Sequence, residues 1–444
     1  MFLSSNDVKS IADRLLELSK ADSCTIHVEG GETQSLRFAN NSATTNIATA
    51  DVELRVESHI GGRTGAVATA GLDMNDLARA LARSEEIARL LPVDPEYLAP
   101  LGPQNYAETN RYDEATGDLR LGSLADAAAS VIAQGEKRAV NMFGCATSGR
   151  RFEAWATSNG LFAYDRWSEI DLSTTARHRT DDWSGWAGAC EFAATRLDAE
   201  DIGRRAAQKA ARDAPVLDLE PGRYTVILEP VAVAELARWL LWLMDARAAD
   251  EGRSFFSGKG GGTRLGERLF DPKLTIRSGP DDAIAPEAAF GAEGLPHRAR
   301  RWIDKGALRS LWRSRYWAEK TGTEPVPAAK SFTVEGGDAT LEEMIRQTRC
   351  GILVTRLWYT NLVAPRSLLL TGLTRDGNFL VENGEIVAPA RNMRFNESLA
   401  GIFSRIAALG PSARVWRDMG RGAAISAPPL LVEGFEFSSK SSGI

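Results

Sequence analysis

The stretch "VAVAELARWLLWLMDARAADEGRSFFSGKGGG", residues 231–262, decides how the second half of the chain is organised. Its first part is apolar on nearly every face of a helix, and only Glu235 and Arg238, which are three residues apart and able to pair, interrupt that surface. A helix that is apolar all round is buried, so we predict one that lies between two sheets or under a partner. Pro230 suits its first turn, and Gly252 is expected near its end.

The sequence around this helix predicts mainly strands. The segment "YTVILEP" runs into the helix, and in "SLLLTGLTRDGNFLVENGEIV" the pairs Asp376–Gly377 and Asn383–Gly384 are predicted turns of a three-stranded meander. Further helices are expected only near residues 299–320 and 341–348. Such a pattern is typical of a closed or strongly curved antiparallel sheet, so residues 220–444 are predicted to form a β-rich, barrel-like domain.

The first half of the chain predicts helices mixed with antiparallel strands. Gly30–Gly31 and Asn40–Asn41 are expected to break short strands, and Asn159–Gly160 is predicted to form the type I′ turn of a hairpin. Helical spacing of apolar residues marks four segments, namely the N-terminal one and those near 71–92, 121–135 and 198–214. The two prolines and the glycine between residues 214 and 221 suggest a boundary. We therefore predict an α+β chain whose N-terminal α+β domain, residues 1–215, holds a mixed antiparallel sheet with helices.

Composition narrows the class of protein. A net charge of -6 over 444 residues argues against nucleic acid as the main partner. The four cysteines lie far apart without a CxxC pair, which is typical of a reducing compartment. The N-terminus lacks the basic region and apolar segment of a signal peptide, and no apolar run is long enough to span a bilayer. We expect a cytoplasmic protein that has no contact with membranes.

The sequence contains no recognisable catalytic or metal motif. Its four histidines are isolated from one another, with no HExxH and no cysteine at ligand spacing, so we predict no metal bound by this chain. The glycine-rich segment "SGKGGGTRLG" (residues 257–266) differs from a phosphate-binding loop because its lysine precedes the glycines and no Lys-Ser/Thr follows them. No GxSxG elbow is present, and no histidine lies near Ser254 or Ser257 to activate either hydroxyl.

One basic, aromatic segment leaves two interpretations open. The sequence "HRARRWIDKGALRSLWRSRYWAEK" interleaves arginines and tryptophans, as single-stranded nucleic-acid binders do. It is also compatible with an amphipathic helix whose arginines face outward and whose tryptophans lie in the core. A nucleic-acid or acidic-partner binding protein that acts through residues 298–320 is therefore the alternative function.

The chain resembles the TldD/TldE (PmbA) proteins, a family once described as modulators of DNA gyrase and now understood as a zinc-metalloprotease system. Four pieces carry the likeness, in the order of the family, and together they span nearly the whole chain: residues 51–90, "YTVILEP" with its helix and "RSFFSGKGG", residues 305–322, and "TGLTRDGNFLVENGEIVAPARNMRFNESLAGIFSRI". The last piece is the most specific.

In this family two related subunits assemble, and the TldD type carries an HExxxH helix that supplies zinc ligands and a general base. When the family's sequence is aligned at "SFFSG", the first histidine, the glutamate and the second histidine of the motif fall on Ala237, Arg238 and Trp242. None of these side chains is able to bind zinc or act as a general base. Cys350 does not match the setting of the metal cysteine of the family. The chain therefore resembles the TldE type. The resemblance implies no cofactor in this chain, zinc only in a TldD-like partner, and a metal site filled by tryptophans.

The resemblance further implies a non-catalytic subunit that assembles as a dimer, with a TldD-like subunit or with itself, and helps to hold an extended peptide during proteolysis or peptide maturation. Exposed backbone would pair with the peptide as an added strand. The peptide-binding residues that the resemblance implies are Ser254, Ser257, Gly258, Asn361, Thr371, Arg375 and Asp376.

Overall fold

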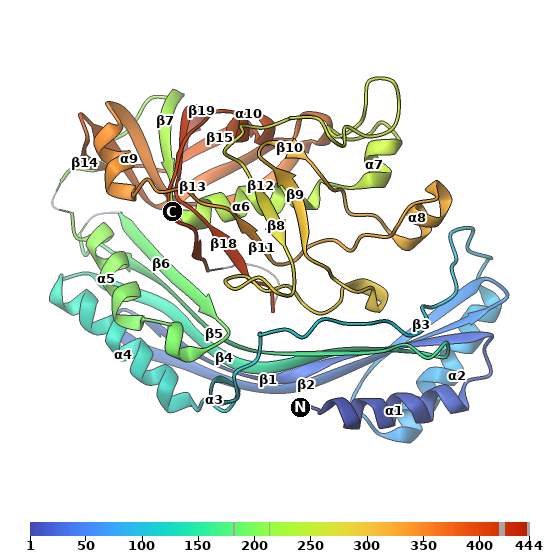
Figure 1. Cartoon of the computed structure of the whole chain (residues 1–444). Helices are drawn as coiled ribbons and strands as arrows, with labels where there is room; N and C mark the ends of the chain where they lie inside the picture. The colour runs from blue at the N-terminus through green and yellow to red at the C-terminus, as the bar shows by residue number, and fades with distance from the viewer. Residues whose placement is uncertain (181–182, 213, 417–421, 442–444) are drawn as a thin grey trace.

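A computed structural model describes residues 1–180, 183–212, 214–416 and 422–441. A long curved sheet from the first half of the chain carries the second half on its concave side, and the helices of the first half cover its other side (Figure 1). The prediction of an α+β chain with an antiparallel N-terminal sheet and a β-rich second half is confirmed. Across the described ranges, no helix has the length and apolar character needed to cross a membrane.

The N-terminal sheet is antiparallel and six-stranded, in the order β3-β2-β1-β4-β5-β6. Its strands are β1 (Ser23–Ala39), β2 (Ser42–Ile60), β3 (Arg63–Ala70), β4 (Asn141–Thr157), β5 (Phe162–Arg177) and β6 (Ser184–Glu191). Its helices are α1 (Ser5–Leu18), α2 (Met74–Leu90), α3 (Glu114–Gly117), α4 (Leu121–Lys137) and α5 (Ala199–Ala210), with a 3₁₀ turn, η1 (Ala194–Arg196). Two apolar clusters lie under the helices, one beneath α1 and α2 and the other beneath α4 and α5.

Turn chemistry in this sheet agrees in part with prediction. Asn40 and Asn41 both have positive φ, at 50° and 60°, and join β1 to β2. The hairpin of β4 and β5 is confirmed, but only Gly160 of its turn has positive φ. The expected break at Gly30–Gly31 is wrong, because both residues lie inside β1. A Cβ on Gly31 would lie 2.4 Å from the carbonyl oxygen of Arg150, so glycine here permits close strand packing.

Two further sheets make up the second half. The seven-stranded sheet contains β7 (Gly222–Leu228), β12 (Cys350–Ala364), β13 (Leu369–Glu382), β14 (Glu385–Ala390), β15 (Met393–Ser398), β16 (Ile406–Leu409) and β19 (Leu430–Lys440). The six-stranded sheet contains β8 (Ile276–Ser278), β9 (Arg300–Asp304), β10 (Ala307–Leu308), β11 (Phe332–Val334), β17 (Ala413–Arg414) and β18 (Ile425–Ala427). The remaining helical elements are α6 (Pro230–Trp242), α7 (Ala246–Asp250), α8 (Arg315–Thr321), α9 (Leu341–Gln347), α10 (Leu399–Ser404), η2 (Ala292–Gly294) and η3 (Pro365–Ser367).

The barrel-like form expected for the second half is not clearly present among the described residues. Pairing does pass from β12 through β7, β19, β15 and β13 back to β12. However, register shifts interrupt several of these pairs, and β14 and β16 lie outside the circuit. The predicted meander is also simpler than expected. Asn383–Gly384 is a true turn, whereas Asp376–Gly377, with φ of 53° and 124°, forms a bulge within β13.

Helix α6 lies between these two sheets, as its all-round apolar sequence predicts. It packs on β7 and β12 from one sheet and on β18 from the other, and Leu236, Ala237 and Leu240 are completely buried. The helix ends at Trp242 rather than near Gly252. The backbone of Met244 and Ala246 pairs there with Trp312, and the short helix α7 follows.

The helix expected near residues 299–320 is wrong. This segment forms strands β9 and β10 and, after a turn, the short helix α8. Trp302 and Trp317 are nevertheless buried, and several arginines pair with acidic side chains, among them Arg301 with Asp304.

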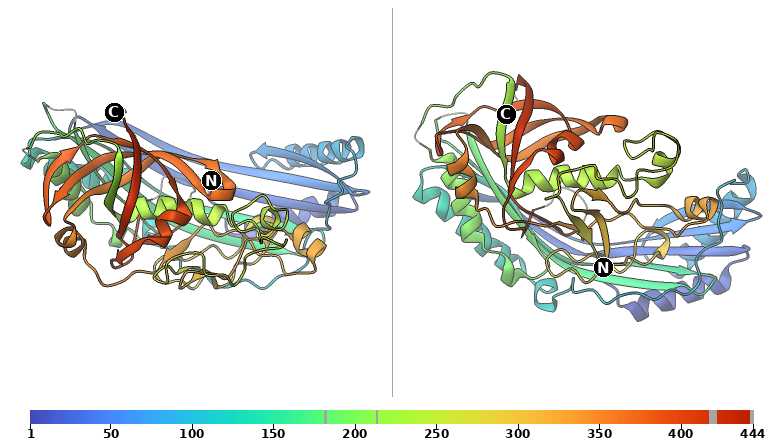
Figure 2. Two further views of the ribbon diagram at one scale, coloured as in Figure 1. Left: turned by 90° about the horizontal axis from the view of Figure 1, so that it is seen from above. Right: turned by 45° about the horizontal axis from the view of Figure 1, so that its top comes forward.

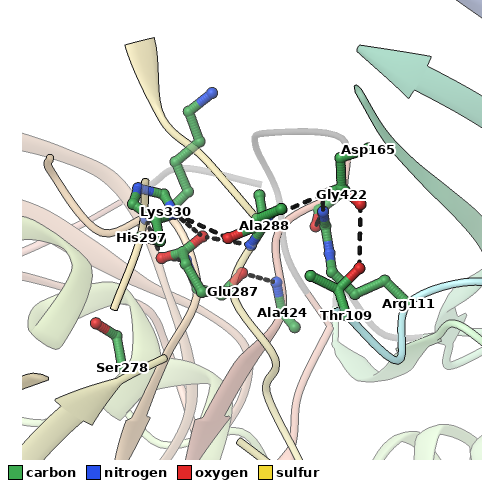
Figure 3. Close-up of polar contacts among 12 residues, drawn as sticks. Thr109, Arg111, Asp165, Ser278, Glu287, Ala288, His297, Lys330, Gly422 and Ala424 are labelled. Atoms are coloured by element: carbon green, nitrogen blue, oxygen red, sulfur yellow. Dashed lines mark hydrogen bonds and ion pairs between the residues drawn. The ribbon is translucent and has the colours of Figure 1, made fainter. Parts of the chain in front are cut away.

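A buried polar network joins the two halves of the chain (Figure 3). Arg111, in the segment that precedes α3, forms an ion pair with Asp165 of β5 and donates to the carbonyl oxygen of Gly422. Asp165 also accepts from Thr109 at 3.1 Å and from the backbone N–H of Ala289 at 3.2 Å. Because an isolated buried charge is costly, this pair must stay intact for the halves to remain docked.

The same network continues into the second half (Figure 3). Glu287 accepts hydrogen bonds at 2.9 Å from the backbone N–H groups of Lys330 and Ser331. His297 lies 3.7 Å from Glu287 and makes a 3.1 Å hydrogen bond to the carbonyl oxygen of Ala288. These bonds fix the loop between β8 and β9 to the residues that precede β11, and the Ala289 N–H joins the same loop to Asp165 of the N-terminal sheet.

We expect Arg111→Ala to lower the free energy of unfolding by about 3–5 kcal/mol, because Asp165 would be left buried without its partner. Urea denaturation followed by circular dichroism measures this change. Arg79→Ala is the matched control, since Arg79 pairs with Asp76 on the surface and its loss should cost less than about 1 kcal/mol. Equal effects of the two substitutions would contradict the role assigned to Arg111.

Alkaline pH should weaken the same junction through Tyr106. Its hydroxyl donates to the carbonyl oxygen of Gly294 at 2.7 Å, and burial raises the pKa of Tyr106 to about 12. A pKa above the usual value of about 10 means that the folded state holds this proton more tightly. The corresponding stability is complete below pH 10 and is lost as pH rises from about 10 to 12.

Between pH 9.5 and 11.5, wild-type protein should therefore lose about 1–2 kcal/mol more unfolding free energy than Tyr106→Phe, after allowance for partial exposure. Urea titrations at each pH measure the difference. Tyr359→Phe, which alters an exposed ring, should follow the wild type. Parallel curves for wild type and Tyr106→Phe would refute the prediction.

Candidate functional site: a groove beside helix α6

One side of α6 remains open to solvent and borders a groove. This wall is formed by Val231, Ala234, Glu235 and Arg238, whose spacing of i, i+3, i+4 and i+7 places them on one face of the helix. The remaining lining residues come from β12 and from the segment near β18: Arg356, Leu357, Trp358, Tyr359, Trp416 and Ile425. Four helix positions thus face a wall of aromatic and basic side chains.

The only carboxylate on the helix wall is fully engaged. Arg238 donates to Glu235 through Nε at 3.2 Å and through Nη2 at 2.9 Å, and Trp239 donates its indole N–H to the same carboxylate at 3.0 Å. Arg238 also lies over the Trp239 ring, 5.5 Å from its centroid. Such a two-pronged ion pair orients the Glu235 carboxylate and occupies its oxygens, which leaves it poorly placed to position a water molecule.

The opposite wall is a stack of arginine and tryptophan side chains. The guanidinium of Arg356 lies over both Trp186 and Trp358, at 5.1 and 5.2 Å from their centroids, and Arg375 lies 4.7 Å from the centroid of Trp358. Trp186 meets Trp416 edge to face at 5.3 Å. Aromatic faces and guanidinium groups of this kind bind extended chains by stacking and by hydrogen bonds to carbonyl or carboxylate oxygens.

Asp376 connects this wall to the N-terminal sheet. Its carboxylate is paired with Arg356 at 2.9 Å and accepts from the hydroxyl of Ser184, on β6, at 2.8 Å. Nearby, Lys209 of α5 forms a 2.7 Å ion pair with Glu229, the residue directly before α6. Burial lowers the pKa of Lys209, and Glu229 opposes that shift. The groove therefore rests on two ion pairs at the junction of the halves, and one of them bridges it directly.

Tyr359 stands at the mouth of the groove. Its ring is 72% exposed, and its φ of 51° is unusual for a residue with a side chain. The amide of Asn361 donates to the Tyr359 carbonyl oxygen at 2.9 Å and supports this bulge between β12 and β13. Strained backbone with an exposed aromatic ring is common at binding sites.

No set of three or more His, Cys, Asp or Glu side chains within the described ranges is placed to hold a metal ion. The histidines are separate in space as well as in sequence: His27 bonds to Glu153, His59 to Thr64, and His297 to the Ala288 carbonyl oxygen.

Family models agree with this architecture. The PmbA/TldA metallopeptidase central domain matches residues 112–213, and the PmbA/TldA metallopeptidase C-terminal domain matches residues 221–439. The chain belongs to the PmbA/TldD family. A metalloprotease from Methanothermobacter thermautotrophicus is 23% identical over 235 residues, which is 50% of this chain and 50% of that relative. The chain thus spans about half of the length of this curated relative.

Solved structures show the same PmbA/TldD fold over nearly the whole chain. TldE from Thermococcus kodakarensis has a TM-score of 0.84 at 16% identity and covers 98% of this chain and 100% of its own. A proposed modulator of DNA gyrase from Thermotoga maritima has a TM-score of 0.83 at 19% identity, with coverages of 97% and 100%. A similar protein from Bacteroides thetaiotaomicron has a TM-score of 0.82 at 20% identity, with coverages of 98% and 99%.

The three positions aligned with the HExxxH motif of the family's TldD members do not share a location. Ala237 is completely buried in the core, Arg238 lines the groove, and Trp242 is 59% exposed. Trp242 therefore does not fill a former metal site, although it meets Trp239 edge to face. Glu235, one turn before Trp239, lines the groove and accepts the indole N–H of Trp239.

The predicted peptide-binding residues are not brought together as one set. Arg375 and Asp376 lie against the groove through Trp358 and Arg356. Asn361 and Thr371 face each other across β12 and β13, farther along the hairpin.

The three predicted residues of the glycine-rich loop lie apart from the groove lining. Ser254 and Ser257 bond to backbone N–H groups of their own turn, and Gly258 donates to the Gly262 carbonyl oxygen. Their local turn chemistry is satisfied, as the sequence permits for a glycine-rich loop.

Sequence analysis missed four residues that line the groove, Arg356, Trp358, Tyr359 and Trp416, and Trp186, which contacts Arg356 and Trp416. A cluster of tryptophan and arginine on short, separate segments is visible in the sequence, but only long-range pairing brings these segments together.

Proposed function

We propose that this chain is a non-catalytic, TldE-like subunit of a TldD/TldE-type zinc metalloprotease and that the groove beside α6 holds an extended peptide during proteolysis or peptide maturation. The observation that carries the proposal is the composition of the groove. Where a metallopeptidase helix would present metal ligands, α6 presents an ion pair, Glu235–Arg238, facing aromatic side chains. These groups bind and orient a chain but activate no water.

Catalysis in this proposal belongs to the partner. Zinc would be held by a TldD-like subunit, where it would lower the pKa of a bound water and polarise the scissile carbonyl group. This chain would contribute binding through Arg356, Trp358 and Tyr359. We place the assembly in the cytoplasm, and the partner is a TldD-like subunit or a second copy of the chain.

The alternative, nucleic-acid or acidic-partner binding through residues 298–320, has less support. The aromatic rings that would stack on bases are partly in the core, since Trp302 and Trp317 are buried. Arg315 is engaged with Glu293 and with the Ala99 carbonyl oxygen.

Purified, tag-free chain is expected to contain much less than one zinc atom per chain by elemental mass spectrometry, because the described residues offer no ligand set. The chain alone should hydrolyse no peptide, and addition of a zinc-bearing TldD-like subunit should restore cleavage. Zinc near one atom per chain that survives mild chelation would refute the non-catalytic assignment.

Trp358→Ala should weaken peptide binding at least about tenfold, because it removes the ring on which Arg356 and Arg375 stack. The probe is a pool of fluorescently labelled, unstructured dodecapeptides, and binding is measured by fluorescence anisotropy. Trp242→Ala is the matched control, since Trp242 is exposed and lies outside the groove lining.

Equal losses in the two variants would contradict the placement of the site. Absence of binding to wild-type protein, alone and with the zinc-bearing subunit, would contradict peptide binding itself.

A further inference from the structure

Two arginines lie opposite each other on the basic wall of the groove. Arg356 of β12 and Arg375 of β13 are direct partners in the register of these antiparallel strands, and paired residues project from the same face of a sheet. In both views of Figure 2 the two strands, drawn in orange, lie beside the yellow-green helix α6. Like charges that face each other across two strands are destabilising. The wall therefore needs negative charge to offset this repulsion.

Asp376 supplies one negative charge and gives most of it to Arg356. Its Oδ2 lies 2.9 Å from Nη2 of Arg356 but 3.5 Å from Nε of Arg375. Its Oδ1 is already taken by the hydroxyl of Ser184 at 2.8 Å. The shorter distance is that of a charge-assisted hydrogen bond, and the longer one is not. Two guanidinium groups thus share one carboxylate, and the wall keeps an excess of positive charge at Arg375.

Arg375 also has donors that lack acceptors. Its Nε is buried and makes no hydrogen bond, and its side chain donates to no other residue in the described part of the chain. Stacking on the ring of Trp358, 4.7 Å from the centroid, holds the guanidinium in place instead. The side chain is 27% exposed, so solutes reach it from the solvent. A buried donor without an acceptor is costly and calls for a water molecule or a ligand.

The other carboxylates near the groove are occupied elsewhere. Glu235 is bound by side chains of its own helix, and Glu229 is bound by the buried lysine of α5. Asp171 accepts from the indole N–H of Trp416 at 3.0 Å and does not line the groove. None of these three carboxylates bonds to Arg375. Its acceptor is therefore missing from the described residues.

The free space in the groove is small. It amounts to about 70 Å³, roughly half of the ~150 Å³ of a cavity that holds a benzene molecule. A carboxylate fits such a space better than an aromatic ring does. The exposed ring of Tyr359 and the half-buried ring of Trp358 border it. Apolar rings next to a charge pair exclude water and so strengthen the attraction between the charges.

We propose that the groove selects peptides that carry a carboxylate, and that this carboxylate binds Arg375 beside Trp358. An aspartate or glutamate side chain and the free C-terminal end of a peptide present the same two oxygens to a guanidinium group. The added negative charge offsets the repulsion between Arg356 and Arg375. This inference rests on the proposed function, because it specifies which peptides the groove holds.

Four matched peptides test the selectivity and identify the source of the carboxylate. Each is an unstructured dodecapeptide of Gly, Ser and Ala with a neutral fluorophore at its N-terminus, a central Glu or Gln, and a free or amidated C-terminus. Fluorescence anisotropy gives the Kd of each peptide for the wild-type chain. The best carboxylate-bearing peptide should bind at least about tenfold more tightly than the peptide with Gln and an amide. Tight binding of the amidated Glu peptide identifies the side chain, and tight binding of the Gln peptide with a free end identifies the C-terminus.

Arg375→Gln should reduce this tenfold preference to less than about twofold, because it removes the guanidinium and keeps a polar side chain. Arg366→Gln is the matched control. It changes the net charge by the same amount, but Arg366 is exposed on the η3 turn and makes no ion pair within the described residues, so the preference should persist. Circular dichroism confirms that both variants are folded.

Salt offers a second measurement that needs no substitution. Raising NaCl from about 50 to 500 mM should reduce the preference of the wild-type chain at least about twofold, because the Arg375 side chain is partly exposed and its charge is screened.

Equal affinities of the four peptides for the wild-type chain would overturn this inference and leave peptide binding itself intact. A preference that Arg375→Gln leaves unchanged would also overturn it, as would equal losses in Arg375→Gln and Arg366→Gln. Absence of binding by every peptide, with the chain alone and with the zinc-bearing subunit, would contradict the proposed function as well.

Discussion

Burial of helix α6 between two sheets is the constraint on which the second half of the molecule depends. Leu236 and Leu240 are fully buried one helical turn apart, and each buried leucine contributes about 1.5–3 kcal/mol. Because both sheets need this apolar surface, the helix cannot turn about its axis without exposing it. Its few polar residues are therefore fixed on the one remaining face, and that face is the wall of the groove.

This constraint explains the chemistry of the groove. A helix held on three sides has room for functional groups only at positions such as 231, 234, 235 and 238. Ala237 points into the core, where a larger and polar side chain would be overpacked and without a partner. A metal ligand on α6 would have to replace Ala234 or a nearby groove residue. In this chain those positions hold a small side chain and an ion pair instead.

The sequence indicated the parts of the fold that depend on local periodicity. The apolar helix, the four helices of the first half and the turn at Asn383–Gly384 follow directly from spacing and turn chemistry. It indicated less of the groove, because Trp186, Trp358 and Trp416 meet only through pairing between distant strands. Asp376–Gly377 satisfies a turn and a bulge equally well, and only its partner strand decides between them.

The two halves of the chain are coupled where the groove is built. Ser184 and Trp186 belong to the N-terminal sheet, yet Ser184 bonds to Asp376 and Trp186 supports Arg356. The basic wall of the groove would lose this support if the halves separated. The Arg111–Asp165 network fixes the same junction from the other end. The shape of the groove therefore depends on docking of the two halves. A ligand that stacks on Trp358 should therefore favour the docked state, because Ser184 and Trp186 of the N-terminal sheet support the Asp376–Arg356 pair beside that ring.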